Sequence, residues 1–156
     1  MKRILLLALS HLVALALGFG LGIYWLPILA APAAPTAADV RAAAQGAAYT
    51  AVFRRDLRGS DPLHWGEGQV SVGPAAVSLM GKIAPGPAYK LYLVPEFVQD
   101  AQEFKRVKAR SLPVADVKTF ENFIVPLPPD APPERFNTVV VWCESFSQFI
   151  TAGQYR

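Results

Sequence analysis

The sequence predicts an all-β domain, a single sandwich or barrel-like unit, behind an N-terminal transmembrane helix. An uncharged apolar run opens the chain, an Ala- and Pro-rich stretch follows, and short strand-like segments separated by Gly and Pro fill the rest. Short strands at such regular spacing are typical of β-sandwiches and barrels. We therefore expect three parts: a signal anchor or signal peptide at 1–31, a linker at 32–48 and a β domain at 49–156.

The apolar run carries no formal charge from Ile4 to Ala34. About twenty helical residues span a bilayer, whereas the apolar core of a cleavable signal peptide is only about 7–15 residues long. This length favours an uncleaved anchor that includes Ile4 and Trp25. Small residues such as Ala30 and Ala33 leave cleavage open as the alternative.

Charge predicts the orientation of this anchor. Lys2 and Arg3 should stay in the cytoplasm, which sends the domain to the extracytoplasmic side, expected to be the periplasm. Tyr24 and Trp25 fit an interfacial aromatic belt at the far end. The membrane is thus the first expected partner.

The net charge of +3 does not indicate nucleic acid binding. Lys2 and Arg3 supply two of the 15 basic residues, against 12 acidic ones, so the rest of the chain is almost neutral. A nucleic-acid-binding domain carries a clustered basic surface instead.

Residues 32–48 read as a tether with a short helix from Ala37 to Gln45. Beyond them, strand-like composition predicts about seven strands. Proline and glycine in "GSDP" and "PGP" mark turns, and the final strand is "FNTVVVWCESFSQFITAG". The segments expected to be strands are "YTAVFRRD", "LHWGEGQVSVG", "AAVSLMGK", "AYKLYLVP", "EFKRVKARSLP" and "KTFENFIVP".

Two details of this assignment concern particular side chains. In "EFKRVKARSLP", alternation places Phe104, Arg106 and Lys108 on one face of a strand, although a short helix near "PEFVQDAQEF" is an alternative. The aromatic residues of the C-terminal part, including Phe146, are assigned to the core.

Candidate chemistry rests on few residues. Outside the anchor the chain has one histidine, His64 in "HWGEG", and one cysteine, Cys143 in "VVVWCE". Zinc needs three or four ligands, so no structural zinc site is predicted. A Cys–His pair requires only that these two meet in the fold. The alternatives are a hydrogen-bonded structural histidine and a buried, inert thiol.

Four segments in order resemble the DM13 domain family. They are "SDPLHWGEGQVSV", "APGPAYKLYLVP", "KTFENFIVPLP" and "FNTVVVWCESFSQFITAGQY", and we expect the resemblance to extend over residues 50–156. The resemblance implies an extracytoplasmic β-sandwich-like module with a redox or electron-transfer role. A departure is Glu121-Asn122-Phe123, where animal members often have Asn-Gln-x-Tyr.

The resemblance also implies site residues. The family's cysteine corresponds to Cys143, a redox group or a haem contact, and its histidine to His64, an assistant or second ligand. A haem cofactor and a redox partner in the cell envelope follow as expectations. The supporting positions are Trp65, Gly68, Gly86, Pro87, Trp142 and Glu144.

Two further interpretations stay open at this point. The domain can be a non-catalytic binding or structural module with Cys143 as a buried small hydrophobe. A leftover cysteine can also pair between two chains. Nothing in the sequence indicates a turnover reaction, so an enzyme is not expected.

Overall fold

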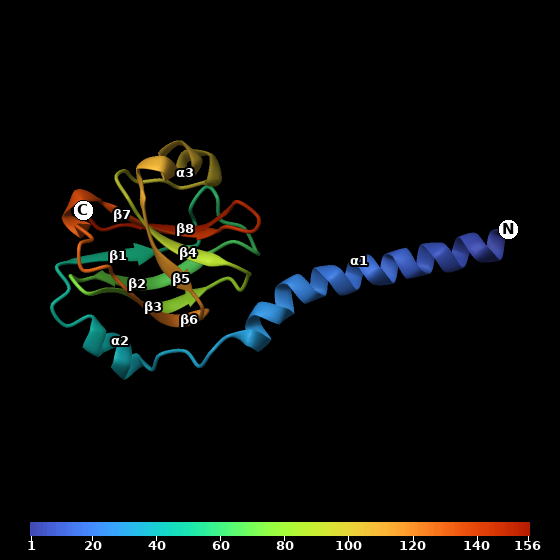
Figure 1. Cartoon of the computed structure of the whole chain (residues 1–156), viewed down its shortest axis with the longest axis horizontal. Helices are drawn as coiled ribbons and strands as arrows, with labels where there is room; N and C mark the ends of the chain where they lie inside the picture. Colours follow the sequence, from blue (N-terminus) through green and yellow to red (C-terminus); the bar gives the residue numbers. More distant parts are fainter.

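The computed structural model describes residues 1–156 as a β-sandwich with a long N-terminal helix projecting from one end (Figure 1). One sheet has the strand order β1-β2-β3-β6 and the other β5-β4-β7-β8, and neighbouring strands are antiparallel. The predicted all-β sandwich behind an apolar helix is confirmed. The strands are β1 (Tyr49–Phe53), β2 (Gly66–Val72), β3 (Ala76–Ile83), β4 (Tyr89–Val94), β5 (Leu112–Val117), β6 (Glu121–Pro126), β7 (Thr138–Cys143) and β8 (Gln148–Gln154).

The N-terminal helix α1 comprises Lys2–Ala30, 29 residues of which none is buried. It is long and apolar enough to cross a membrane. An N-terminal helix of this kind can be an anchor or a signal sequence.

A short helix, α2 (Ala37–Ala43), connects α1 to the sandwich. It begins with a capping box. The Thr36 side chain accepts a hydrogen bond from the backbone N–H of Asp39, and the Asp39 side chain accepts one from the backbone N–H of Thr36. Val40 on this helix is only 2% exposed. The helix ends two residues before the predicted Gln45 and packs on the domain.

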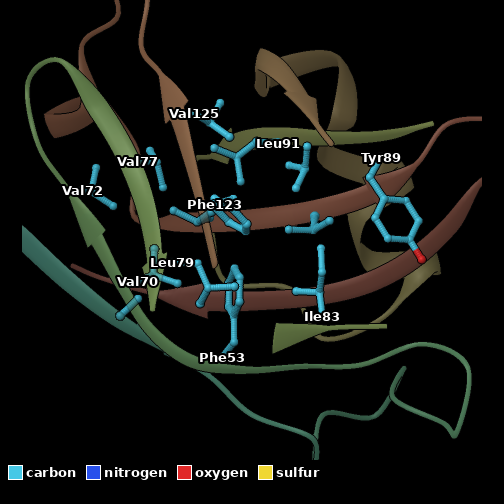
Figure 2. Close-up of a cluster of buried hydrophobic side chains, with 14 of the residues drawn as sticks. Phe53, Val70, Val72, Val77, Leu79, Ile83, Tyr89, Leu91, Phe123 and Val125 are labelled. Atoms are coloured by element: carbon cyan, nitrogen blue, oxygen red, sulfur yellow. The ribbon is translucent and has the colours of Figure 1, made fainter. Parts of the chain in front are cut away.

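The main core fills the space between the two sheets. Figure 2 shows Phe53, Leu79 and Leu91 in this layer, with Tyr89 at one end of it. The strand alternation explains the layer, because every second side chain of a strand faces the same side. Cys143 belongs to this core and not to the outer surface.

A second apolar cluster lies on the outer face of the β5-β4-β7-β8 sheet, beneath α3 (Ala101–Val107). The strand predicted at "EFKRVKARSLP" was wrong over its first part, which forms α3 and the 3-10 turn η1 (Lys108–Arg110). Asp100 caps the helix by accepting from the Glu103 N–H at 2.8 Å. Phe104 and Val107, three residues apart, share its buried face.

The C-terminal segment also differs from the prediction. It forms two strands, β7 and β8, joined by a turn over residues 144–147, and not a single final strand. Ser147 in this turn has a φ of 51°, and no glycine or proline marks the reversal. Phe146 at the tip is 51% exposed, so its assignment to the core was wrong. A second 3-10 turn, η2 (Pro133–Arg135), precedes β7.

Candidate functional site

Cys143 is the last residue of β7, between Tyr89 of β4 and Gln148 of β8. Its side chain faces the layer between the sheets and is 3% exposed. The thiol donates to the carbonyl oxygen of Pro87, with an Sγ–O distance of 3.1 Å. The sulfur is therefore held in position by the β3–β4 connection, residues 84–88.

Burial raises the pKa of the Cys143 thiol, because the apolar surroundings disfavour the thiolate. The backbone N–H groups of Phe146 and Ser145 act in the opposite direction, and the Glu144 carboxylate adds to the rise. The thiol is therefore protonated at neutral pH, unlike the low-pKa cysteines that act as nucleophiles.

His64 is held by a tight local turn at the end of the β1–β2 loop, residues 54–65. Asp61 Oδ1 accepts from the backbone N–H groups of Leu63 and His64 at 2.7 and 2.8 Å. Asp61 Oδ2 lies 2.8 Å from Nδ1 of His64. A carboxylate only accepts, so Nδ1 carries the proton and Nε2 remains free to bind elsewhere.

The surroundings of Asp61 favour the ionised form of its carboxyl group. Desolvation alone would raise the pKa of its carboxyl group, but the hydrogen bonds from His64 and Leu63 outweigh that effect and place the pKa below its ordinary value. Asp61 therefore stays ionised and orients the imidazole, as carboxylates commonly do for functional histidines.

The structure places Cys143 and His64 on the wall of one cavity of about 300 Å³. The β3–β4 connection supplies further wall, and Tyr24 of α1 closes one side. The remaining lining residues, mostly apolar, are Gly20, Ile23, Leu63, Pro85, Gly86, Pro87, Tyr89 and Ile150. A thiol and an oriented imidazole thus share one small, largely apolar space.

Gly86 and Pro87 shape this cavity from the β3–β4 connection. A Cβ at Gly86 would lie 2.3 Å from the Tyr89 hydroxyl oxygen, so only glycine lets the connection pass this close to the ring. Pro87 supplies the carbonyl that binds the thiol. Burial raises the pKa of Tyr89 far above its ordinary value, so its phenol remains protonated.

Comparison with known proteins adds one match. The family model described as "Electron transfer DM13" matches residues 58–155, which is most of the sandwich and more than half of the chain. The chain belongs to the DM13 family. No curated protein and no solved structure matches it. The matched range includes both His64 and Cys143.

Two of the predicted supporting residues, Trp142 and Glu144, lie on the outer face of the β5-β4-β7-β8 sheet, opposite the cavity. Trp142 packs on Phe104 of α3, with ring centroids 4.9 Å apart, and its buried Nε1 has no hydrogen-bond partner. The Glu144 carboxylate accepts from the Tyr92 hydroxyl and from Lys108 Nζ, the latter at 2.6 Å. Alternation along β7 explains why these neighbours of Cys143 are not part of the cavity.

The remaining predicted residues, Trp65 and Gly68, also lie outside it. The Trp65 ring is covered by the Arg55 guanidinium, 3.4 Å from its centroid, and Arg55 is paired with Glu67 at 2.7 Å. Gly68 has a φ of 124°, and a Cβ there would lie 2.3 Å from the Met80 carbonyl oxygen. Neither residue lines the cavity: Trp65 lies just before β2, and Gly68 lies within it.

Three residues at or beside this cavity were not predicted from the sequence. Asp61 orients His64, Tyr89 walls the cavity beside the thiol, and Tyr24 reaches it from α1. Only Asp61 carried a local signal: an Asp followed by Pro, with His64 three residues on, is a side-chain-capped turn. Tyr89 and Tyr24 meet the cavity only through the tertiary fold.

The cavity does not fit the haem that the resemblance implies. An axial ligand must present its thiolate or imidazole to the iron. The Cys143 thiol is buried, protonated and bonded to Pro87, and a space of about 300 Å³ is at the small end for small-molecule sites. The structure also has no group of three His, Cys, Asp or Glu residues that could hold a metal ion.

Proposed function

We propose that this DM13 protein is a membrane-tethered, extracytoplasmic module that passes single electrons through Cys143, with His64 as the proton acceptor. The observation that carries this proposal is the shared cavity, in which the only cysteine meets the only histidine of the domain. The electron-transfer description of the DM13 family supports the same class of function.

The proposed step balances within the cavity. The Cys143 thiol loses one electron to an oxidised one-electron carrier in the cell envelope, and its S–H proton leaves the Pro87 carbonyl and crosses the cavity to Nε2 of His64. A thiyl radical and an imidazolium remain. The Asp61 carboxylate, 2.8 Å from Nδ1, stabilises that imidazolium. Return of one electron to sulfur and of the proton from Nε2 restores the thiol.

Electron transfer suits this site better than thiol–disulfide exchange. Exchange requires a thiolate to attack a disulfide sulfur in direct contact. Cys143 is 3% exposed, its pKa is raised, and the chain offers no second cysteine to resolve a mixed disulfide. An electron needs no covalent contact, and the aromatic side chains of Tyr24 and Tyr89 line the same cavity as the sulfur.

Tethering rests on α1 and its flanks. The helix is long and apolar enough to span a bilayer, and Lys2 and Arg3 precede its apolar core. A positive start favours retention of the N-terminus in the cytoplasm, which places the domain outside it, in the periplasm. Tyr24 and Trp25 supply aromatic anchors at the outer interface.

The test is stepwise oxidation of the full chain in liposomes by a strong one-electron oxidant such as hexachloroiridate(IV). We expect one electron per chain in the wild type, none in Cys143→Ser, and a slower reaction in His64→Ala. Glu96→Gln, which alters an exposed carboxylate paired with Arg110 and does not act on Cys143, is the control and should react like the wild type. Equal electron counts in the wild type and Cys143→Ser would contradict the proposal.

One observation favours a second candidate, a binding or structural module. Cys143 is part of the main core, and burial keeps its thiol protonated, as for an inert packing residue. In that case the thiol should resist alkylation until the domain unfolds, and Cys143→Ala should retain all partner binding. The oxidation experiment separates the two, because a packing residue delivers no electron.

A further inference from the structure

The cavity end of the sandwich is also the end from which α1 departs (Figure 1). The antiparallel order brings four connections to this end, because β1, β3, β5 and β7 finish here and their partners begin here. These connections are residues 54–65, 84–88, 118–120 and 144–147, which we call the proximal end.

The helix reaches the cavity at a depth that matches a bilayer surface. At about 1.5 Å per residue, α1 is about 44 Å long, against about 30 Å for the hydrocarbon core. Gly20, Ile23 and Tyr24 wall the cavity, and Gly20 lies about 27 Å along the helix from Lys2. If Lys2 stands at the inner surface, the cavity lies at the level of the outer lipid head groups.

The connection between helix and domain is too short to let the domain move away. Ala30 ends α1, and the carbonyl of Pro35 accepts from Asn122 Nδ2 at 3.1 Å. The five residue-to-residue steps from Ala30 to Pro35 span at most about 18 Å even when fully extended. Buried Val40 then fixes α2 to the sandwich. The domain therefore cannot move away from the end of α1, and its proximal end stays within about the thickness of one lipid leaflet of the membrane surface.

Exposed apolar side chains gather where contact would occur. Among the domain's large exposed apolar residues, Leu63 (60% exposed) and Phe146 (51%) lie in connections of the proximal end. The last turns of α1 carry exposed apolar residues as well, among them Trp25, Leu26 and Leu29. Clustered exposed apolar residues mark contact surfaces, and a lipid interface lies next to these.

We propose that the proximal end rests on the bilayer surface, with Leu63 and Phe146 inserted among the lipid head groups. The cavity of Cys143 and His64 then opens toward the lipid interface and not toward bulk water. This proposal depends on the membrane tethering of the proposed function, but it does not depend on electron transfer. It commits to the lipid surface as the partner of this end.

Depth-dependent fluorescence quenching tests the docking. The full chain, in a Cys143→Ser background, is reconstituted in phosphatidylcholine–phosphatidylglycerol vesicles with single NBD labels at Leu63→Cys or Phe146→Cys. The control is Ala75→Cys, because Ala75 is also exposed but lies in the turn between β2 and β3, at the opposite end of the sandwich. Vesicles carrying nitroxides near the head groups provide the quencher.

We expect a blue-shifted NBD emission and strong loss of fluorescence at positions 63 and 146, and little change at 75. Quenching at 63 and 146 no greater than at 75 would overturn the proposal. The two labelled sites are independent, so one misfolded variant leaves the other to decide. Flotation of the same vesicles reports the tether separately, because a chain that does not float contradicts the tether itself.

Discussion

At the scale of single residues, the site depends on how two polar side chains are held. The His64 ring is oriented by Asp61 through a 2.8 Å contact, and the Cys143 thiol by the Pro87 carbonyl. Neither residue carries a strong signal by itself. Each side chain is fixed by one hydrogen-bond partner. The Asp61 carboxylate fixes the tautomer of His64, and the Pro87 carbonyl binds the buried thiol of Cys143.

Asp61→Asn should weaken the site without removing either reactive residue. The amide oxygen can still accept a hydrogen bond but carries no charge to stabilise the imidazolium, so electron transfer to hexachloroiridate(IV) should slow by about tenfold. ¹⁵N NMR of the His64 ring should show Nδ1 protonated in the wild type and a mixed tautomer in the variant. An unchanged rate together with an unchanged ring spectrum would exclude Asp61 as a positioning residue.

The raised pKa of Cys143 predicts how stability changes with pH. The unfolded thiol ionises near pH 8.5, whereas the folded one ionises at a higher pH. The contribution of the neutral thiol is therefore complete below about pH 8.5 and is lost as pH rises toward the folded pKa. Denaturant unfolding between pH 8 and 10 should show a steeper loss of stability for the wild type than for Cys143→Ser. Parallel curves would contradict the burial of a protonated thiol.

At the scale of elements, the strands and their turns were largely predictable, and the exceptions have physical causes. Alternation of apolar residues located β1 to β4, and proline and glycine marked their connections. The reversal between β7 and β8 escaped because Ser147 adopts a φ of 51° without a glycine. The α3 helix escaped because alternating basic residues resemble a strand, while the decisive Asp100 cap is a single residue.

Gly68→Ala should destabilise the β2–β3 pairing. A side chain at a φ of 124° is strained, and its Cβ would lie 2.3 Å from the Met80 carbonyl oxygen, so we expect a loss of about 3 kcal/mol. Gly73→Ala is the control, because the nearest atom to its Cβ is 3.6 Å away. Urea unfolding of both variants provides the comparison, and equal midpoints would show that Gly68 is not required.

The α3 cap offers a second element-scale test. Asp100→Ala should lower the free energy of unfolding by about 1 kcal/mol, because the Glu103 N–H loses its acceptor. Asp130→Ala, at an exposed position between β6 and β7, should leave stability unchanged. Thermal unfolding of the two variants measures the difference, and an equal shift in both would contradict the capping role.

At the scale of the whole molecule, the sequence predicted an apolar helix followed by an all-β domain, but not how the two meet. Composition alone suggested a loose tether at 32–48, whereas α2 packs through Val40 and Asn122 binds Pro35. The common cavity of Cys143 and His64 could likewise not be predicted from the sequence. It forms because two residues that are 79 positions apart in the chain lie at the same end of the sandwich.

Asn122→Gly should loosen the helix from the domain while keeping the fold. Asn122 has a φ of 46°, which glycine adopts freely, so the variant removes only the bonds to Pro35 and to the Gly81 N–H. We expect faster hydrogen exchange in residues 31–36 and 80–82 and no change in β7. Unchanged exchange at 31–36 would show that the connection is held by other contacts.

The proposed function requires that Cys143, in its shared cavity with His64, carries the electron. Voltammetry of the full chain adsorbed in a supported bilayer is the sharpest test. We expect one reversible one-electron wave in the wild type, present in Glu96→Gln and absent in Cys143→Ser. A wave of the same potential and size in Cys143→Ser would contradict it, because the electron would then reside elsewhere in the protein.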